Sequence, residues 1–320
     1  MSDSDYGLPA SPSPTPRDAA APVNASDADI ILRSVDAVDF RAHKLLLSMA
    51  SPFFQNLFTL PQPPTSSPHA SPNELKDGIS VVCLSEDEHA VDMMLRYCYP
   101  RTVCPAEPTL DTTEDVKLTL VLISKYQLAG VQGIVVQRLK AGPTLPQVLS
   151  IFLKAWLLDL RDVVPIAARH TLRADVDTSE DYEELNQVPC IVLVKLANFR
   201  KACADAASAR PWTDDTTQRL SFPVADFSAS CSANNNYRYS LCPAIDQYLK
   251  DAFIELKLLP SGWNLVFQNQ IVTAVEKVSR SCKACHANDR ISPAVIKMSR
   301  FLYEEVESRI SKIEMEKSFF

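Results

Sequence analysis

The sequence predicts an α+β domain, with a short β-sheet flanked by helices, followed by an all-α extension. The first observation is a change of apolar period, because residues 30–42 fit two strands and helical spacing begins at His43. The second is that helical patterns dominate after Leu145. The chain therefore divides into a tail expected to be disordered at 1–25, an α+β domain at 26–140 with a mobile loop at 60–78, a helical segment at 145–210, and a mostly helical region containing cysteines and aromatic residues at 211–320.

Two strands and two helices are expected to open the α+β domain. Residues 30–32 suit a buried strand, residues 38–42 alternate like a half-buried one, and residues 34–37 form the hairpin loop between them. Pro52 cannot lie inside a helix, so two helices are predicted, with Ser51 capping the second. Their apolar residues at helical spacing are Leu46, Met49, Ala50, Phe53, Phe54 and Leu57.

A third strand and further helices complete the predicted domain. The strand covers residues 79–84, and Ser85 with Glu88 fits a capping box for the next helix. Thr112 or Thr113 is expected to cap the helix after that. Near the end of the chain, one apolar stripe of helical period is expected to pack on its own domain: Val295, Met298, Leu302, Val306, Ile310 and Ile313.

Several of these segments closely resemble the BTB/POZ family. The residues that carry the resemblance are Asp29-Ile30, Phe40-x-x-His43-Lys44-x-x-Leu47, Ser51-x-Phe53-Phe54 with Phe58, Leu84-Ser85-Glu86-Asp87, and Leu95-Arg96-Tyr97-Cys98-Tyr99-Pro100. The sequences of the last two motifs are similar to those of fungal, basidiomycete-like BTB proteins. Residues 167–172 and 198–203 resemble the helical extension of those proteins, which is loosely akin to BACK helices.

The resemblance implies a protein that binds other proteins through its surface and is not an enzyme. It implies that Asp29 and Lys44 form a buried charged pair near a dimer interface. The residues expected to take part in protein interaction are Asp29, His43, Lys44, Phe53, Phe54, Leu57 and Phe58. Because the first 25 residues show no strand or helix pattern, a homodimer formed by exchange of an N-terminal strand is not expected.

Two functions stay open on this resemblance. One is a substrate adaptor for a cullin-type ubiquitin ligase, which in related proteins commonly uses a hydrophobic-x-Glu motif; here Pro61-Gln62-Pro63 stands near that place. The other is a BTB scaffold or transcription-associated oligomer without ligase function. The partners expected are therefore proteins: a cullin scaffold, a second copy of the chain, or both.

Charge and apolar runs argue against other kinds of partner. Residues 1–116 hold 7 Lys and Arg against 17 Asp and Glu, which is a net charge of −10. Nucleic-acid binding needs a basic surface, so none is expected from this part of the chain. The apolar runs are short for a membrane span, and the N-terminus has no secretory leader pattern, so we expect an intracellular protein, cytoplasmic or nuclear.

The six glycines form no phosphate-binding or nucleophile-elbow motif, so no enzymatic signature is present. The one chemical motif is Cys282-x-x-Cys285-His286. As a redox or haem-binding segment it would make the chain a redox protein, a third and remote alternative. As a structural zinc site it would use Cys282, Cys285 and His286 with Cys231 and Cys242, and the opposing interpretation is a set of reduced thiols without a cofactor.

Overall fold

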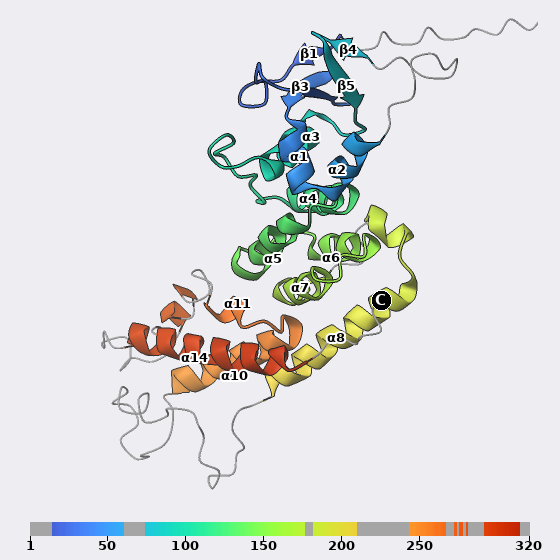
Figure 1. Cartoon of the computed structure of the whole chain (residues 1–320). Coiled ribbons are helices and arrows are strands. Elements are labelled where there is room, and N and C mark those ends of the chain that lie inside the picture. Colours follow the sequence, from blue (N-terminus) through green and yellow to red (C-terminus); the bar gives the residue numbers. More distant parts are fainter. Residues whose placement is uncertain are drawn as a thin grey trace, which may run out of the picture. The chain divides into compact units, whose positions relative to one another are not determined.

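The structure is a computed structural model that describes residues 15–60, 74–176, 182–209, 243–266, 272–273, 275–277, 280 and 291–313. The chain divides into two compact units, residues 1–138 and 139–320 (Figure 1). All strands of the described chain belong to the first unit, and the second is helical. The predicted order, an α+β domain followed by an all-α region, is therefore confirmed.

The first unit combines five strands with helices on one side of them (Figure 1). The strands are β1 (Arg17–Asp18), β2 (Ile30–Arg33), β3 (Val38–Ala42), β4 (Leu75–Lys76) and β5 (Ile79–Cys83). The helices are α1 (Lys44–Ala50), α2 (Pro52–Thr59), α3 (Glu88–Cys98), α4 (Thr113–Tyr126) and α5 (Gln132–Ala141), with a 3₁₀ turn, η1 (Ala129–Val131), before α5.

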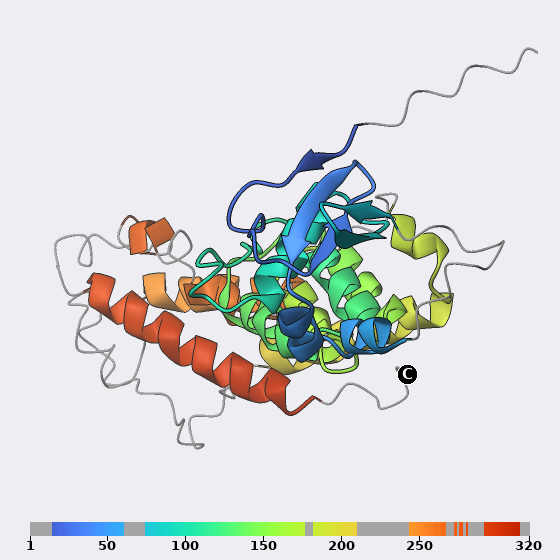
Figure 2. The same ribbon diagram turned by 45° about the horizontal axis from the view of Figure 1, so that its top comes forward.

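The strands lie in the order β1-β3-β2-β5-β4. The β2–β3 hairpin is antiparallel, and the β2–β5 and β1–β3 pairs are parallel. Ala37 in the hairpin loop has φ +62°, a left-handed conformation that lets the loop close tightly. Figure 2 shows the sheet from a second direction, with the β2–β3 hairpin at its centre.

Strand β1 corrects one prediction, because residues 15–25 were expected to be disordered. The backbone N–H groups of Arg17 and Ala19 donate to the carbonyls of Ala37 and Asp39 at 3.0 and 2.9 Å. Val23 is buried, and its carbonyl accepts from the N–H of Arg41 at 2.9 Å. This segment gains order from the edge of β3, which its own composition does not reveal. Residues 1–14 of the predicted tail lie outside the described residues.

Two further predictions need correction. The loop predicted at 60–78 contains strand β4, which pairs with β5 in a hairpin around Gly78 at φ +76°; residues 61–73 lie outside the described residues. The cap of α3 is Asp87 and not Ser85, since Asp87 Oδ1 accepts from the N–H of Ala90 at 2.9 Å. The helix begins at Glu88, so Ser85 lies two residues before the cap position, and its Oγ accepts from Lys125 Nζ at 2.7 Å.

The core of the first unit is formed by apolar side chains of β2, β3 and α1–α4. Its largest fully buried members are Ile30, Ile31, Leu32, Phe40, Leu47, Phe54, Met94, Leu95, Leu120 and Tyr126. Burying each such side chain contributes about 1.5–3 kcal/mol before the cost of ordering the chain is counted. Of the apolar residues predicted at helical spacing from Leu46 to Leu57, only Phe54 is fully buried. The buried residue of α1 is Leu47, which was not in that set.

The second unit is built from helices. They are α6 (Val148–Leu157), α7 (Val164–His170), α8 (Cys190–Ser208), α10 (Pro243–Leu258), α11 (Trp263–Val266) and α14 (Ile291–Ser311), with 3₁₀ turns η2 (Thr171–Arg173) and η3 (Glu183–Asn186). Helix α14 is long and unbroken (Figure 2). Its predicted stripe is confirmed from Val295 to Ile310, where every member is at most 2% exposed.

No helix within the described ranges combines the length and apolarity that crossing a bilayer requires.

Candidate protein-interaction site

The break between α1 and α2 is the local feature that organises this site. Ser51 lies between the helices and is 0% exposed. Its Oγ accepts from the N–H of Phe54 at 3.2 Å, which makes it the predicted cap of α2, and donates to the carbonyl of Tyr126 at 2.6 Å. The buried hydroxyl of Ser51 thus caps the start of α2 and links it to the C-terminal end of α4.

An aromatic cluster fixes the inner face of α2. Phe54 stacks on Tyr126 with ring centroids 5.3 Å apart and planes inclined by 6°. Phe58 also stacks on Phe54, with ring centroids 5.8 Å apart. Phe53 meets Tyr126 edge-on at 5.2 Å. Phe54 is 0% exposed, whereas Phe53, Leu57 and Phe58 are half-buried. Phe54, predicted as an interaction residue, is therefore a core residue, while the other three keep some surface.

Tyr126 also joins the cluster to a partly buried carboxylate, that of Glu86. Its hydroxyl donates to Glu86 Oε2 at 2.6 Å, and Lys125 pairs with the other oxygen of Glu86. Burial alone would raise the pKa of Glu86, but the hydrogen bonds from Lys125 and Tyr126 outweigh it, so the pKa lies below its ordinary value. Glu86 is thus held as an anion beneath the aromatic cluster.

His43 anchors the start of α1. Its backbone N–H donates to the hydroxyl of Tyr99 at 2.9 Å, and its Nδ1 lies 2.9 Å from the same oxygen. Burial raises the pKa of Tyr99 to about 12, so this hydroxyl stays protonated and can donate to Nδ1. The Nε2 of His43 is then free to donate to Asp27, whose Oδ1 lies 3.3 Å away.

Asp29 and Lys44 do not form the buried charged pair that the resemblance implied. Oδ1 of Asp29 accepts from the backbone N–H of Lys44 at 2.7 Å, and Asp29 is exposed. The physical reason is the start of α1, where the first amides have no partner within the helix and attract a carboxylate. Asp29, which directly precedes β2, therefore ties the start of α1 to the start of this strand.

The outer face of α1 carries an apolar stripe. Leu45 and Met49 lie one helical turn apart and are 69% and 77% exposed. Met49 was named among the apolar residues at helical spacing, and the structure places it on the outer face of α1. Leu45, Leu46 and Leu47 precede Met49, so the sequence alone does not decide which side of α1 packs against the core. Leu60, just after α2, is also exposed, at 61%.

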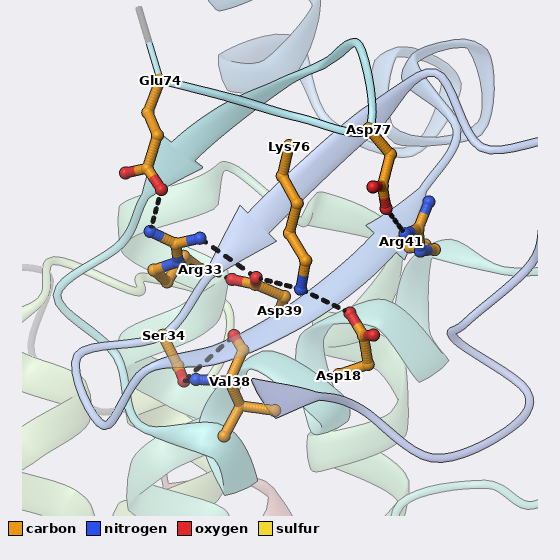
Figure 3. Close-up of polar contacts among 9 residues, drawn as sticks. All are labelled: Asp18, Arg33, Ser34, Val38, Asp39, Arg41, Glu74, Lys76 and Asp77. Carbon is orange, nitrogen blue, oxygen red and sulfur yellow. Dashed lines mark hydrogen bonds and ion pairs between the residues drawn. The ribbon is translucent and has the colours of Figure 1, made fainter. Parts of the chain in front are cut away.

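A charged network lies at the hairpin (Figure 3). Asp39 on β3 is 0% exposed and accepts from Arg33 on β2 at 3.0 Å and from Lys76 on β4 at 2.8 Å. Burial acts to raise the pKa of Asp39, but these two cations outweigh it and hold the pKa below its ordinary value. Lys76 also binds Asp18 on β1 at 2.7 Å. Since β1 and β4 are the two ends of the strand order, the sheet is strongly curled.

Comparison with known families identifies this architecture. The model of the BTB/POZ domain matches residues 23–142. Residues 23–142 are a BTB/POZ domain. No curated protein matches the chain. The match begins at a buried residue, Val23, which agrees with the ordered segment along β3.

BTB/POZ domains are protein–protein interaction and oligomerisation modules and are typically not enzymes. Among the described residues of the BTB/POZ domain, Leu45 and Met49 of the α1 stripe have the largest exposed fractions of any large apolar side chain, a feature that sequence reasoning missed. Among the described residues, no group of His, Cys, Asp and Glu is arranged to hold a metal ion. The residues of the predicted zinc site, Cys231, Cys242, Cys282, Cys285 and His286, lie outside the described residues.

Proposed function

We propose that this protein is an interaction scaffold whose BTB/POZ domain self-associates through α1. The observation that carries the proposal is the exposed pair Leu45 and Met49, one turn apart on a helix that is otherwise tied down at its start by Asp29. A symmetric dimer needs a surface that complements itself, and an exposed apolar stripe can pack against the same stripe of a second copy.

Sedimentation of the full chain over a concentration series tests this proposal. We expect a dimer that Met49→Lys and Leu45→Lys shift toward the monomer, because a charge placed in an apolar interface loses its hydration. The matched control is Val35→Lys in the hairpin loop, where the native side chain is 66% exposed. Self-association that Met49→Lys leaves unchanged, or a monomer throughout, would contradict the proposal.

We further propose that the same domain recruits a cullin scaffold, so that the protein acts as a substrate adaptor of a ubiquitin ligase. The support is the exposed Leu60 directly after α2, next to the half-buried Phe58, together with the helical region that follows the domain. Aromatic side chains are enriched in the cores of protein interfaces, so an exposed leucine beside the half-buried Phe58 offers a surface that a partner can cover.

Calorimetry of the full chain with a purified cullin amino-terminal domain tests the adaptor role. We expect micromolar binding, about −8 kcal/mol, which Leu60→Asp weakens. The control is Leu75→Asp on β4, where the native residue is 63% exposed. A folded sample that releases no heat would favour a scaffold or transcription-associated oligomer without ligase function.

We also propose that residues 145–210 are a BACK-like extension of the fungal, basidiomycete-like type, acting in the cytoplasm, the nucleus or both. The support is the run of helices α6, α7 and α8 directly after the BTB/POZ domain. Imaging of a fluorescent fusion tests the location, and a signal outside these compartments would contradict it.

A further inference from the structure

A cavity of about 390 Å³ lies within the second unit, where α7, α11 and α14 meet. Its polar and aromatic lining includes Lys140, Arg169, Arg173, Trp263, Tyr303 and Glu307. Three of these six residues are cations and one is an anion. The cavity is therefore basic in a chain whose overall charge is −7.

Arg169 is fixed at the C-terminal end of α14. Its Nη1 and Nη2 donate to the carbonyls of Ile310 and Ile313 at 2.9 and 3.1 Å. These acceptors are neutral, and the end of a helix supplies only a partial negative charge. These two hydrogen bonds therefore fix the position of the Arg169 guanidinium without neutralising its positive charge.

Arg173 is held in a similar way. Its Nη1 donates to the carbonyl of Gly142 at 3.1 Å and its Nη2 to that of Lys140, while its Cζ lies 4.4 Å above the ring of Trp263. Stacking on an indole and bonding to carbonyls orients the guanidinium plane. Two arginines on one cavity are therefore oriented before any ligand arrives.

The single carboxylate of the lining is already engaged. Glu307 Oε1 accepts from the N–H of Gly262 at 2.9 Å and from Ser261 Oγ at 3.3 Å. His170, which also lines the cavity, is buried; its Nδ1 lies 3.0 Å from the carbonyl of Leu139, and its Nε2 accepts from the N–H of Leu145 at 3.3 Å. This pattern fits a neutral imidazole with its proton on Nδ1. The formal charge of the lining is then +2.

We propose that this cavity binds the phosphate group of a phosphorylated serine or threonine in a partner protein. A phosphate monoester carries close to two negative charges near neutral pH and three acceptor oxygens, which matches two oriented arginines and a lysine. The volume exceeds what a phosphate alone fills and leaves room for the side chain that carries it. The face of Trp263 against which Arg173 stacks is not open to a nucleobase. The proposal goes beyond the interactions of the BTB/POZ domain and does not depend on them.

The test is binding of the full chain to fluorescein-labelled phosphothreonine peptides of degenerate flanking sequence, measured by fluorescence anisotropy at low salt. The unphosphorylated peptides are the first control, and we expect them to bind about tenfold more weakly or worse. Inorganic phosphate is the second control and is expected to compete only weakly. If it competes as well as the peptide, the ligand is a free phosphate and the peptide assignment is overturned.

Lys140→Gln is the informative variant because Lys140 is exposed and Arg169 has a structural role at α14. Loss of the Lys140 ammonium should weaken phosphopeptide binding about tenfold, which is the effect of one charge-assisted contact. Arg161→Gln is the matched control, since the Arg161 side chain is 68% exposed and does not line the cavity. Equal affinity of the wild type and Lys140→Gln, with both folded, would overturn the proposal, as would equal binding of phosphorylated and unphosphorylated peptides.

Discussion

Arg33 and Asp39 face each other across the β2–β3 hairpin, and Nη2 of Arg33 donates to Oδ2 of Asp39 at 3.0 Å. Asp39 is 0% exposed, so its charge depends on this partner and on Lys76. A buried charge without its partners is costly, whereas a paired one is tolerated. The network therefore makes the hairpin and the far strand β4 fold together.

Asp39→Asn is expected to lower the free energy of unfolding of the BTB/POZ domain by about 2–4 kcal/mol, since it leaves Arg33 and Lys76 near an uncharged group. Hydrogen exchange of peptides from β2 and β3 measures this loss. Asp77→Asn is the matched control, because Asp77 pairs with Arg41 but is 62% exposed, and a change within about 0.5 kcal/mol is expected there. Equal losses in the two variants would contradict a special role of Asp39.

Asp39 should also shape the acid stability of the domain. Its pKa is lower in the folded chain than in the unfolded chain. Its contribution is therefore complete above a pH of about 4 and decreases as the pH falls through the folded-state pKa. Hydrogen exchange as a function of pH is expected to show a shallower loss of stability in Asp39→Asn than in the wild type. Parallel pH profiles of the two proteins would exclude this contribution.

Ser51→Ala removes a cap and a buried partner at once. The N–H of Phe54 and the carbonyl of Tyr126 both lose the Ser51 hydroxyl, so we expect a loss of about 1–3 kcal/mol. The measurement is hydrogen exchange across α2. Thr59→Ala, at the other end of α2, removes an exposed hydroxyl bonded to Asn56 and should change stability by less than about 0.5 kcal/mol.

Much of the BTB/POZ fold could be predicted from the sequence because its signals are local. The period of two in residues 38–42, the proline after Ser51 and the threonine cap at Thr112 each act within a few residues. The helix stripe from Val295 to Ile310 is local in the same sense. These features need no knowledge of what packs against them.

The features that were missed depend on distant partners. Strand β1 is two residues long and is ordered by carbonyls of Ala37 and Asp39, about twenty positions away in the chain. The outward direction of Met49 follows from how α1 packs and not from its apolar spacing. The cations of the second-unit cavity come from α5, α7 and η2, so only the tertiary structure brings them together.

Gly262→Ala should destabilise the second unit. A Cβ at Gly262 would lie 2.9 Å from the carbonyl oxygen and 3.0 Å from the Cα of Tyr303, so the backbone before α11 must move away from α14. We expect a loss of about 1–3 kcal/mol. Tryptophan fluorescence during urea unfolding reports it, because all three tryptophans, at 156, 212 and 263, belong to this unit. Gly130→Ala, where nothing lies within 4 Å of the added Cβ, is the control. Because Gly130 lies in the first unit, circular dichroism follows its unfolding, and the transition should be unchanged.

The cysteines of the described residues should differ in their reaction with iodoacetamide. Burial raises the pKa of Cys98 to about 12 and that of Cys203 to about 11, while Cys83 and Cys190 are exposed. Since the thiolate is the nucleophile, Cys83 and Cys190 should react about a hundredfold faster at pH 8. Mass spectrometry of peptides measures the rates, and fast modification of Cys203 in the folded protein would contradict the packing of α8.

The same alkylation experiment tests the zinc prediction for Cys231, Cys242, Cys282, Cys285 and His286. A structural site holds its cysteines as metal-bound thiolates, which are protected until a chelator removes the ion. We expect reduced thiols that react equally with and without a chelator, and zinc well below one ion per chain by metal analysis. One zinc per chain, together with protection of Cys282 and Cys285 that a chelator abolishes, would establish the metal site instead. Cys282→Ser distinguishes the two cases, because it lowers the metal content only where the site exists.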